Sequence, residues 1–164
     1  MPRHAPIPLL LALLAACASP PPPAEPFPAA IGPVPLHGGG EGRIEPLRDG
    51  VFVLVGAPEG AVPVSGLRGL QDARLVATTR LGEEGLALLA GSVPGCALRH
   101  VLVAVRAEAV RSFPLPDCAR TYALAPASDG RAVAVHEAGS LLPVVFVYRD
   151  GQVMGPVVAR PRQP

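Results

Sequence analysis

The sequence lacks lysine, asparagine and tryptophan, and it contains only two tyrosines and four phenylalanines. So few aromatic side chains leave little material for stacking on sugars or bases, which disfavours a carbohydrate-binding or nucleic-acid-binding module. Alanine, arginine, glycine and proline are abundant. A GC-rich genome produces this bias, so the missing lysine says little about function. The formal net charge is +1, which leaves no basic excess to hold nucleic acid.

The chain begins with a short apolar run, from Ile7 to Ala16. This run has about ten residues, whereas a helix that crosses a bilayer needs about 20. Arg3, His4 and the α-amino group place positive charge before it. A positive start followed by a short apolar core is the pattern of a secretory signal. We therefore interpret residues 1–16 as an export signal.

The residues that end this run are Leu14, Ala15, Ala16 and Cys17. They resemble the lipobox of bacterial lipoproteins, which consists of a branched apolar residue, two small residues and an obligatory cysteine. The resemblance covers residues 1–17 only. It implies that Cys17 receives a diacylglyceryl group, becomes the first residue after cleavage and is then acylated at its amino group. An ordinary secretory signal beside a chance cysteine is the alternative.

The residues after Cys17 bear on location. In lipoproteins an aspartate at this place often retains the protein at the inner membrane, and here Ala18 and Ser19 stand there. The resemblance therefore implies a lipid anchor in the outer membrane, with the protein facing the periplasm. Several acyl chains would give stable anchoring.

The segment between Ser19 and Arg43 contains eight prolines and ends in a glycine-rich stretch. Proline lacks an amide donor and fixes φ, so this segment is not expected in a helix or in the interior of a sheet. We predict a spacer over residues 17–42, a folded domain over residues 43–158 and a short tail over residues 159–164. The domain is large enough to bury a core of its own.

The domain has the turn residues of a β protein. Asp-Gly pairs at residues 49–50, 129–130 and 150–151 each stand between apolar runs, which is typical of hairpins. Pro126 suggests that the second of these turns is loose. A fourth hairpin is expected with its loop at residues 82–85. The spacing of leucines also allows one short helix near residues 65–74, capped by Ser65. The predicted fold is all-β, a small antiparallel sandwich or barrel of hairpins.

Cys96 and Cys118 bracket another apolar segment whose centre is Ala107. A hairpin turning at residues 106–108 places the two cysteines opposite each other, and a two-residue turn at Ala107 and Glu108 shifts the register by one. An exported protein meets an oxidising compartment, so a disulfide is the expected state. A metal site, a redox site and free thiols are the alternatives. Four residues of strand separate Cys96 from His100 by about 13 Å, too far for one zinc ion.

Other candidates for chemistry are sparse. The segment His37-Gly38-Gly39-Gly40 is similar to the oxyanion-hole segment of some lipases, but the chain has no Gly-x-Ser-x-Gly nucleophile motif. His136 and Glu137 could form an acid-base pair with Asp117 or Asp129, although a solvated hairpin end explains them equally. We expect neither a cofactor nor a metal.

Four arginines surround the predicted disulfide hairpin and are candidates for an anion-binding set: Arg99, Arg106, Arg111 and Arg120. A solvated charged surface explains them more simply. Together these features lead us to expect a cell-envelope lipoprotein whose domain is a non-enzymatic binding or accessory module for an envelope protein. A lipid-tethered periplasmic hydrolase and a purely structural envelope protein are the alternatives.

Overall fold

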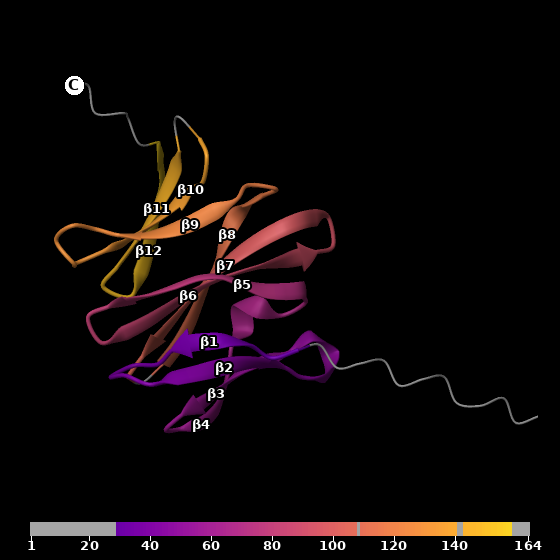
Figure 1. The fold of residues 1–164 in the computed structure, drawn as a ribbon. Helices are drawn as coiled ribbons and strands as arrows, with labels where there is room; N and C mark the ends of the chain where they lie inside the picture. Colours follow the sequence, from indigo (N-terminus) through magenta and orange to yellow (C-terminus); the bar gives the residue numbers. More distant parts are fainter. Residues whose placement is uncertain (1–28, 108, 141–142, 159–164) are drawn as a thin grey trace, which may run out of the picture.

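The computed structural model describes residues 29–107, 109–140 and 143–158. These residues form three antiparallel sheets of four strands, each built from strands that follow one another in the sequence (Figure 1). The N-terminal sheet contains β1 (Ile31–Pro35), β2 (Glu41–Pro46), β3 (Phe52–Ala57) and β4 (Gly60–Pro63). The central sheet contains β5 (Gln71–Leu81), β6 (Glu84–Val93), β7 (Cys96–Arg106) and β8 (Ala109–Cys118). The C-terminal sheet contains β9 (Tyr122–Pro126), β10 (Val133–Glu137), β11 (Val144–Arg149) and β12 (Gln152–Val158).

The central sheet is covered on both faces. Alternate residues of a strand point to opposite sides of a sheet, and Leu89 and Val103 join a core with the N-terminal sheet. Their neighbours Leu88 and Leu102 join a second core with the C-terminal sheet. All four side chains are fully buried. This double covering explains why β6 and β7 are almost continuously apolar, and it makes the fold an all-β sandwich, as predicted.

The predicted hairpins form. In the β11–β12 hairpin Arg149 pairs with Gln152, and both turn residues, Asp150 and Gly151, have positive φ. A type I′ turn needs this conformation at both positions, which is why the Asp-Gly pair marks it. The β2–β3 turn contains a short 3-10 helix, η1 (Arg48–Gly50). The β9–β10 loop is longer, in agreement with Pro126, and the β5–β6 hairpin pairs Leu81 with Glu84.

The prediction of a short helix over residues 65–74 is wrong. Only one 3-10 turn, η2 (Ser65–Leu67), occupies this region, and Ser65 provides no side-chain cap. The helical spacing arises because Leu67 and Leu70 both face the first core, linked by a backbone hydrogen bond of 2.9 Å from Leu70 to Leu67. Gly69 has a φ of 76°, which ends the turn, and β5 then begins at Gln71.

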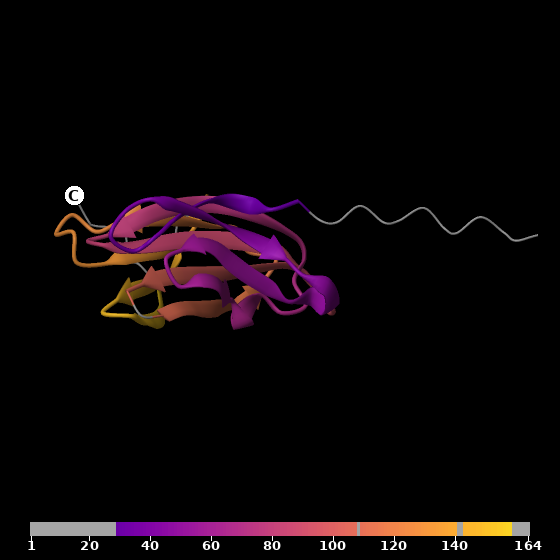
Figure 2. The ribbon, with the colours of Figure 1, turned by 90° about the horizontal axis from the view of Figure 1, so that it is seen from below.

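The folded domain begins before residue 43, the start predicted from the sequence. The strand β1 lies inside the predicted spacer, and its Val34 is fully buried. Its prolines are tolerated because β1 is an edge strand that pairs with β2 alone. Figures 1 and 2 place the start of β1 and η1 at the same end of the molecule. Residues 17–28 and the predicted tail, 159–164, lie outside the described residues.

Candidate functional site

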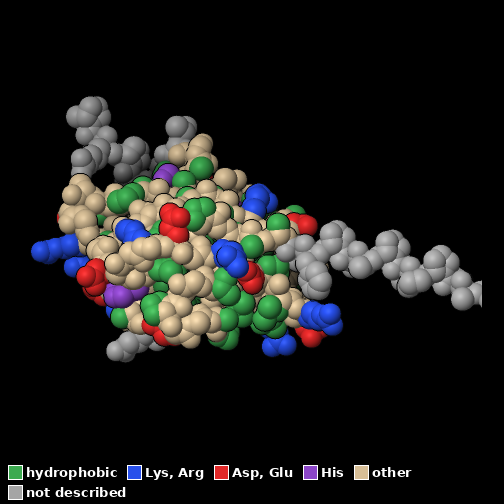
Figure 3. Space-filling view, turned by 60° about the horizontal axis from the view of Figure 1, so that its bottom comes forward, with side chains coloured by type: hydrophobic (Ala, Val, Ile, Leu, Met, Phe, Trp, Pro, Cys, Tyr) green, Lys and Arg blue, Asp and Glu red, His purple; other side chains and the backbone are tan. Residues whose placement is uncertain are grey.

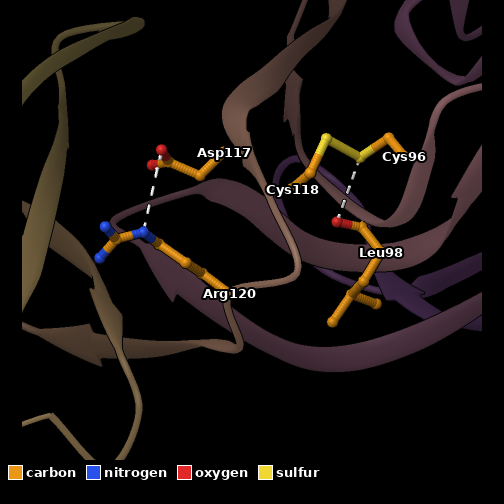
Figure 4. The surroundings of a disulfide bond; sticks show 5 residues. All are labelled: Cys96, Leu98, Asp117, Cys118 and Arg120. Atoms are coloured by element: carbon orange, nitrogen blue, oxygen red, sulfur yellow. Dashed lines mark hydrogen bonds and ion pairs between the residues drawn. A yellow bond between two sulfur atoms is a disulfide. The ribbon is translucent and has the colours of Figure 1, made fainter.

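The cysteines form the predicted disulfide. Cys96, at the start of β7, is bonded to Cys118, at the end of β8, with 5.4 Å between their Cα atoms (Figure 4). Cys96 is buried and Cys118 is exposed. The bond joins the open end of the β7–β8 hairpin, and by the chain-entropy description a loop of this length contributes about 3 kcal/mol to stability.

Of the two registers expected for this hairpin, the structure has the one with a two-residue turn. Arg106 pairs with Ala109, which corresponds to the two-residue turn, and Arg111 therefore lies opposite Ala104 instead of Val103. A register irregularity between Arg99 and Val101 then places Cys118 opposite Arg99. The turn has no glycine or asparagine to fix its position, so the sequence pattern alone could not choose between the two registers.

The four arginines considered as an anion-binding set do not form one group. Arg106 and Arg111 lie near the turn of the β7–β8 hairpin, whereas Arg99 and Arg120 lie near the disulfide at its other end. Arg120 is paired with Glu137 at 2.7 Å and lies 3.8 Å from Asp117 (Figure 4). The predicted cluster is therefore divided between the two ends of one hairpin.

The possible acid-base pair of His136 and Glu137 is not assembled. Glu137 accepts its hydrogen bond from Arg120, and the nearest polar partner of the His136 ring is the carbonyl oxygen of Glu137, 3.4 Å away. Asp117 instead accepts a hydrogen bond of 2.7 Å from the Tyr122 hydroxyl. Burial, together with this hydrogen bond, raises the pKa of Tyr122.

His100 lies in the core. It is 1% exposed, its ring meets that of Tyr122 edge-on at 5.4 Å, and its Nδ1 atom has no hydrogen-bond partner among the described residues. Burial lowers the pKa of His100, and the positive charge of Arg74 lowers it further. A neutral imidazole in an apolar setting is the result.

A polar cluster that the sequence analysis did not predict lies at the end of the central sheet opposite the disulfide. Glu84, the first residue of β6, pairs through one carboxylate oxygen with Arg106 of β7 at 2.8 Å. Its other oxygen accepts a hydrogen bond of 2.6 Å from Tyr148 of β11. Burial and this hydrogen bond raise the pKa of Tyr148. Glu84 thus joins the central sheet to the C-terminal sheet.

The glycine-rich segment 37–40 is the β1–β2 turn and not a linker. Arg80 of β5 clamps it by donating hydrogen bonds of 2.8 and 2.9 Å to the carbonyl oxygens of Leu36 and Gly40. Gly38 donates a backbone hydrogen bond to Glu83, and the His37 ring lies 3.4 Å from the Glu83 carboxylate. No Gly-x-Ser-x-Gly motif exists in the chain to supply a nucleophile for an oxyanion hole.

These groups surround a hollow surface that we call the arginine cleft. Its first part, about 290 Å³, is lined by His37, Glu84, Arg106, Ala107, Ala109 and Arg111. A second part, about 540 Å³, shares Glu84 and Arg106 and extends over the turns of the C-terminal sheet to Arg131 and Arg149. The side chains of Arg111 and Arg131 form no hydrogen bond or ion pair with any described residue. Their guanidinium groups are suited to carboxylate or phosphate oxygens.

Sequence patterns alone could not predict the arginine cleft or the polar contacts of Glu84 beside it. Tyr148 is 64 residues from Glu84, so their contact depends on how the sheets stack. One weak signal was present: Glu84 is the single charged residue at the head of an otherwise apolar strand.

Within the described part of the chain, no group of three histidine, cysteine or acidic side chains is placed to hold a metal ion. No described helix has the length and apolar character to span a membrane. Comparisons with protein-family models, with curated proteins and with solved structures gave no match to this chain.

Proposed function

We propose that this chain is a bacterial envelope lipoprotein, exported by residues 1–16 and anchored through acylated Cys17 to the outer membrane on its periplasmic side. The observation that carries the proposal is the Cys96–Cys118 disulfide in a small β domain. Disulfides persist in oxidising compartments such as the periplasm, so this bond agrees with the export signal seen in the sequence.

We further propose that the domain is a non-enzymatic binding or accessory module that acts through protein contacts at the arginine cleft. The cleft supports this role because Arg111 and Arg131 present guanidinium groups beside a hollow surface. Carboxylates of a partner protein are their natural counterparts. The hydrolase alternative has less support, since His100 is buried and His136 has no carboxylate or serine partner among the described residues.

The anchor is tested with a Cys17→Ser variant expressed beside a Ser19→Ala control. The variant should lose labelling by radioactive fatty acid and leave the membrane fraction, because its hydroxyl is not a substitute for the thiolate nucleophile. The control should keep both properties. Unchanged membrane partitioning of Cys17→Ser would contradict the tether.

The binding role is tested by cross-linking and pull-down from intact cells. Arg111→Glu should abolish the cross-linked complex, because it reverses a charge at the mouth of the arginine cleft. Arg74→Glu, a matched reversal at an exposed position of β5, should leave the complex intact. If no specific partner is recovered with the unmodified protein, the structural alternative takes the place of the binding role.

A further inference from the structure

The folded domain receives its tether at one defined end. Ile31, the first residue of β1, pairs with Ile44 of β2, so the start of β1 lies beside the end of β2. The loop that follows β2 contains η1, and both views of the ribbon place this loop at the end where β1 begins (Figures 1 and 2). Whatever precedes Ala29 therefore joins the domain next to residues 47–51.

This end carries an exposed apolar side chain on a well-held loop. Leu47 is 50% exposed. Its amide donates a hydrogen bond of 2.7 Å to Val51, and Gly50 accepts one of 3.1 Å from Gly69, so both ends of the loop are fixed. The loop therefore holds an apolar side chain in solvent at the end of the domain where the tether joins.

The surface continues beyond the loop. A shallow hollow of about 200 Å³ includes Val51, whose carbonyl oxygen accepts the hydrogen bond from Leu47. Its lining is largely apolar: Val51, Phe52, Pro63, Val64, Ser65 and Arg68. Figure 3 shows hydrophobic side chains gathered near this end of the molecule, with both basic and acidic side chains at their margin. We call Leu47, Arg48, Val51, Pro63 and Arg68 the tether-end patch.

The charges of the patch favour an anionic surface. Arg48 and Arg68 are exposed, and neither forms an ion pair with a described residue. Asp49 is an exposed acidic residue of the same loop and offsets one of these charges, whereas the nearby Glu45 is paired with Arg43 at 2.6 Å, so the patch keeps a net positive charge. Apolar side chains flanked by arginine are the arrangement with which proteins rest on anionic phospholipids.

We propose that the tether-end patch docks on the phospholipid surface to which the chain is anchored, and so fixes the orientation of the domain. This inference rests on the proposed lipid anchor at Cys17. Ala29 follows Cys17 by twelve positions, and even a fully extended chain of this length reaches only about 40 Å. The anchor therefore keeps the patch at a high effective concentration near the bilayer, where a weak contact suffices. The arginine cleft involves other residues and stays available to a partner.

The absence of tryptophan from the chain provides a direct test. Leu47→Trp and Met154→Trp each introduce a single fluorophore at positions of nearly equal exposure, 50% and 49%. Met154 lies on β12 of the C-terminal sheet and serves as the matched control. Each full-length acylated protein is purified from membranes and reconstituted into vesicles of phosphatidylethanolamine and phosphatidylglycerol, with and without brominated acyl chains.

The proposal predicts several-fold stronger quenching by brominated lipid for Leu47→Trp than for Met154→Trp. Equal quenching at both sites, or none at either, would overturn it. A blue shift of Leu47→Trp that grows with protein density but is not quenched would place a second copy of the chain on the patch. A blue shift present in detergent without vesicles would place the chain's own tether there. Either result also overturns the proposal.

A second measurement tests the charges. Arg48→Glu combined with Arg68→Glu, in the Leu47→Trp background, should weaken surface contact roughly tenfold or more, because two attractions to lipid phosphate become repulsions. Added salt should weaken the contact of the unreversed protein. Quenching that resists both changes would overturn the electrostatic part of the inference.

Mass spectrometry of the same preparations separates the two proposals. An acylated protein whose Leu47→Trp is not quenched overturns the orientation alone. A protein without acyl chains at Cys17 overturns the anchor and, with it, the orientation.

Discussion

The hydroxyl of Tyr148 in β11 lies 2.6 Å from the carboxylate of Glu84 in β6, whose other oxygen is paired with Arg106. These contacts connect the two sheets at the edge of the second core, where Phe113 packs edge-on against Tyr148 at 5.9 Å. Tyr148 is fully buried, so its hydroxyl depends on Glu84 for a partner. The junction of the two sheets is thus held by a polar contact as well as by apolar packing.

Tyr148→Phe should lower the free energy of unfolding by about 1.5–3 kcal/mol, because it removes a hydrogen bond to a charged group that is largely shielded from water. Tyr122→Phe is the matched comparison and should cost less, since the side chain of its partner Asp117 is 34% exposed against 19% for Glu84. Urea denaturation of both variants measures the difference. A Tyr148→Phe protein as stable as the parent would show that the bond contributes nothing.

Alkaline pH should destabilise the domain through both tyrosines. Burial and carboxylate hydrogen bonds raise the pKa of Tyr122 and Tyr148 above the ordinary value of 10.0. The unfolded chain therefore loses these protons first, so the stabilisation is complete below pH 10 and is lost as the pH rises above it. Each tyrosine contributes a slope of up to about 1.4 kcal/mol per pH unit. Above pH 10 the unfolding free energy, measured by urea denaturation, should fall less steeply with pH for the Tyr122→Phe/Tyr148→Phe double variant than for the parent. An unchanged dependence on pH would contradict this assignment.

Acidic pH should destabilise the domain through His100. Its pKa is lowered from 6.5 by burial and then by Arg74, so the unfolded chain takes up a proton before the folded one. The stabilisation is complete above pH 6.5 and is lost as the pH falls below it. His100→Leu should remove this part of the pH dependence, measured as the difference in unfolding free energy between pH 7 and pH 5. His136→Leu, at a partly buried position of β10, is the control for replacing an imidazole by leucine.

Turn chemistry made most of the fold predictable. Asp150 and Gly151 both adopt positive φ, which few residue pairs tolerate, so the Asp-Gly pair alone locates the turn. The strand β1 was missed because proline excludes a chain from sheet interiors but not from edges, and no local signal shows which strand will be an edge. The double covering of β6 and β7 is a property of the assembled sheets. Their unbroken apolar runs reflect it, but such runs alone predict only buried strands and do not show that both faces of the sheet are covered.

The candidate site was predictable only where covalent chemistry was involved. Cys96 and Cys118 are the two cysteines of the domain, and any hairpin register near the correct one brings them together. Grouping the arginines by sequence failed because Arg106 and Arg120 lie at opposite ends of the β7–β8 hairpin. The contact between Glu84 and Tyr148 joins residues whose relative position depends on sheet packing, which no local pattern encodes.

Removal of the disulfide should cost about 3 kcal/mol of unfolding free energy, since the unfolded chain regains the freedom of a loop closed across 22 residues. The variant is Cys96→Ser combined with Cys118→Ser, and its stability in urea should equal that of the parent protein after reduction by dithiothreitol. The double variant should show no further response to dithiothreitol, and Cys17→Ser alone should leave the urea midpoint unchanged. Alkylation followed by mass spectrometry gives an independent reading, because neither thiol of the unreduced protein should be modified. If both thiols react without reductant, the bond is absent from the exported protein and the support it lends to the periplasmic location is withdrawn.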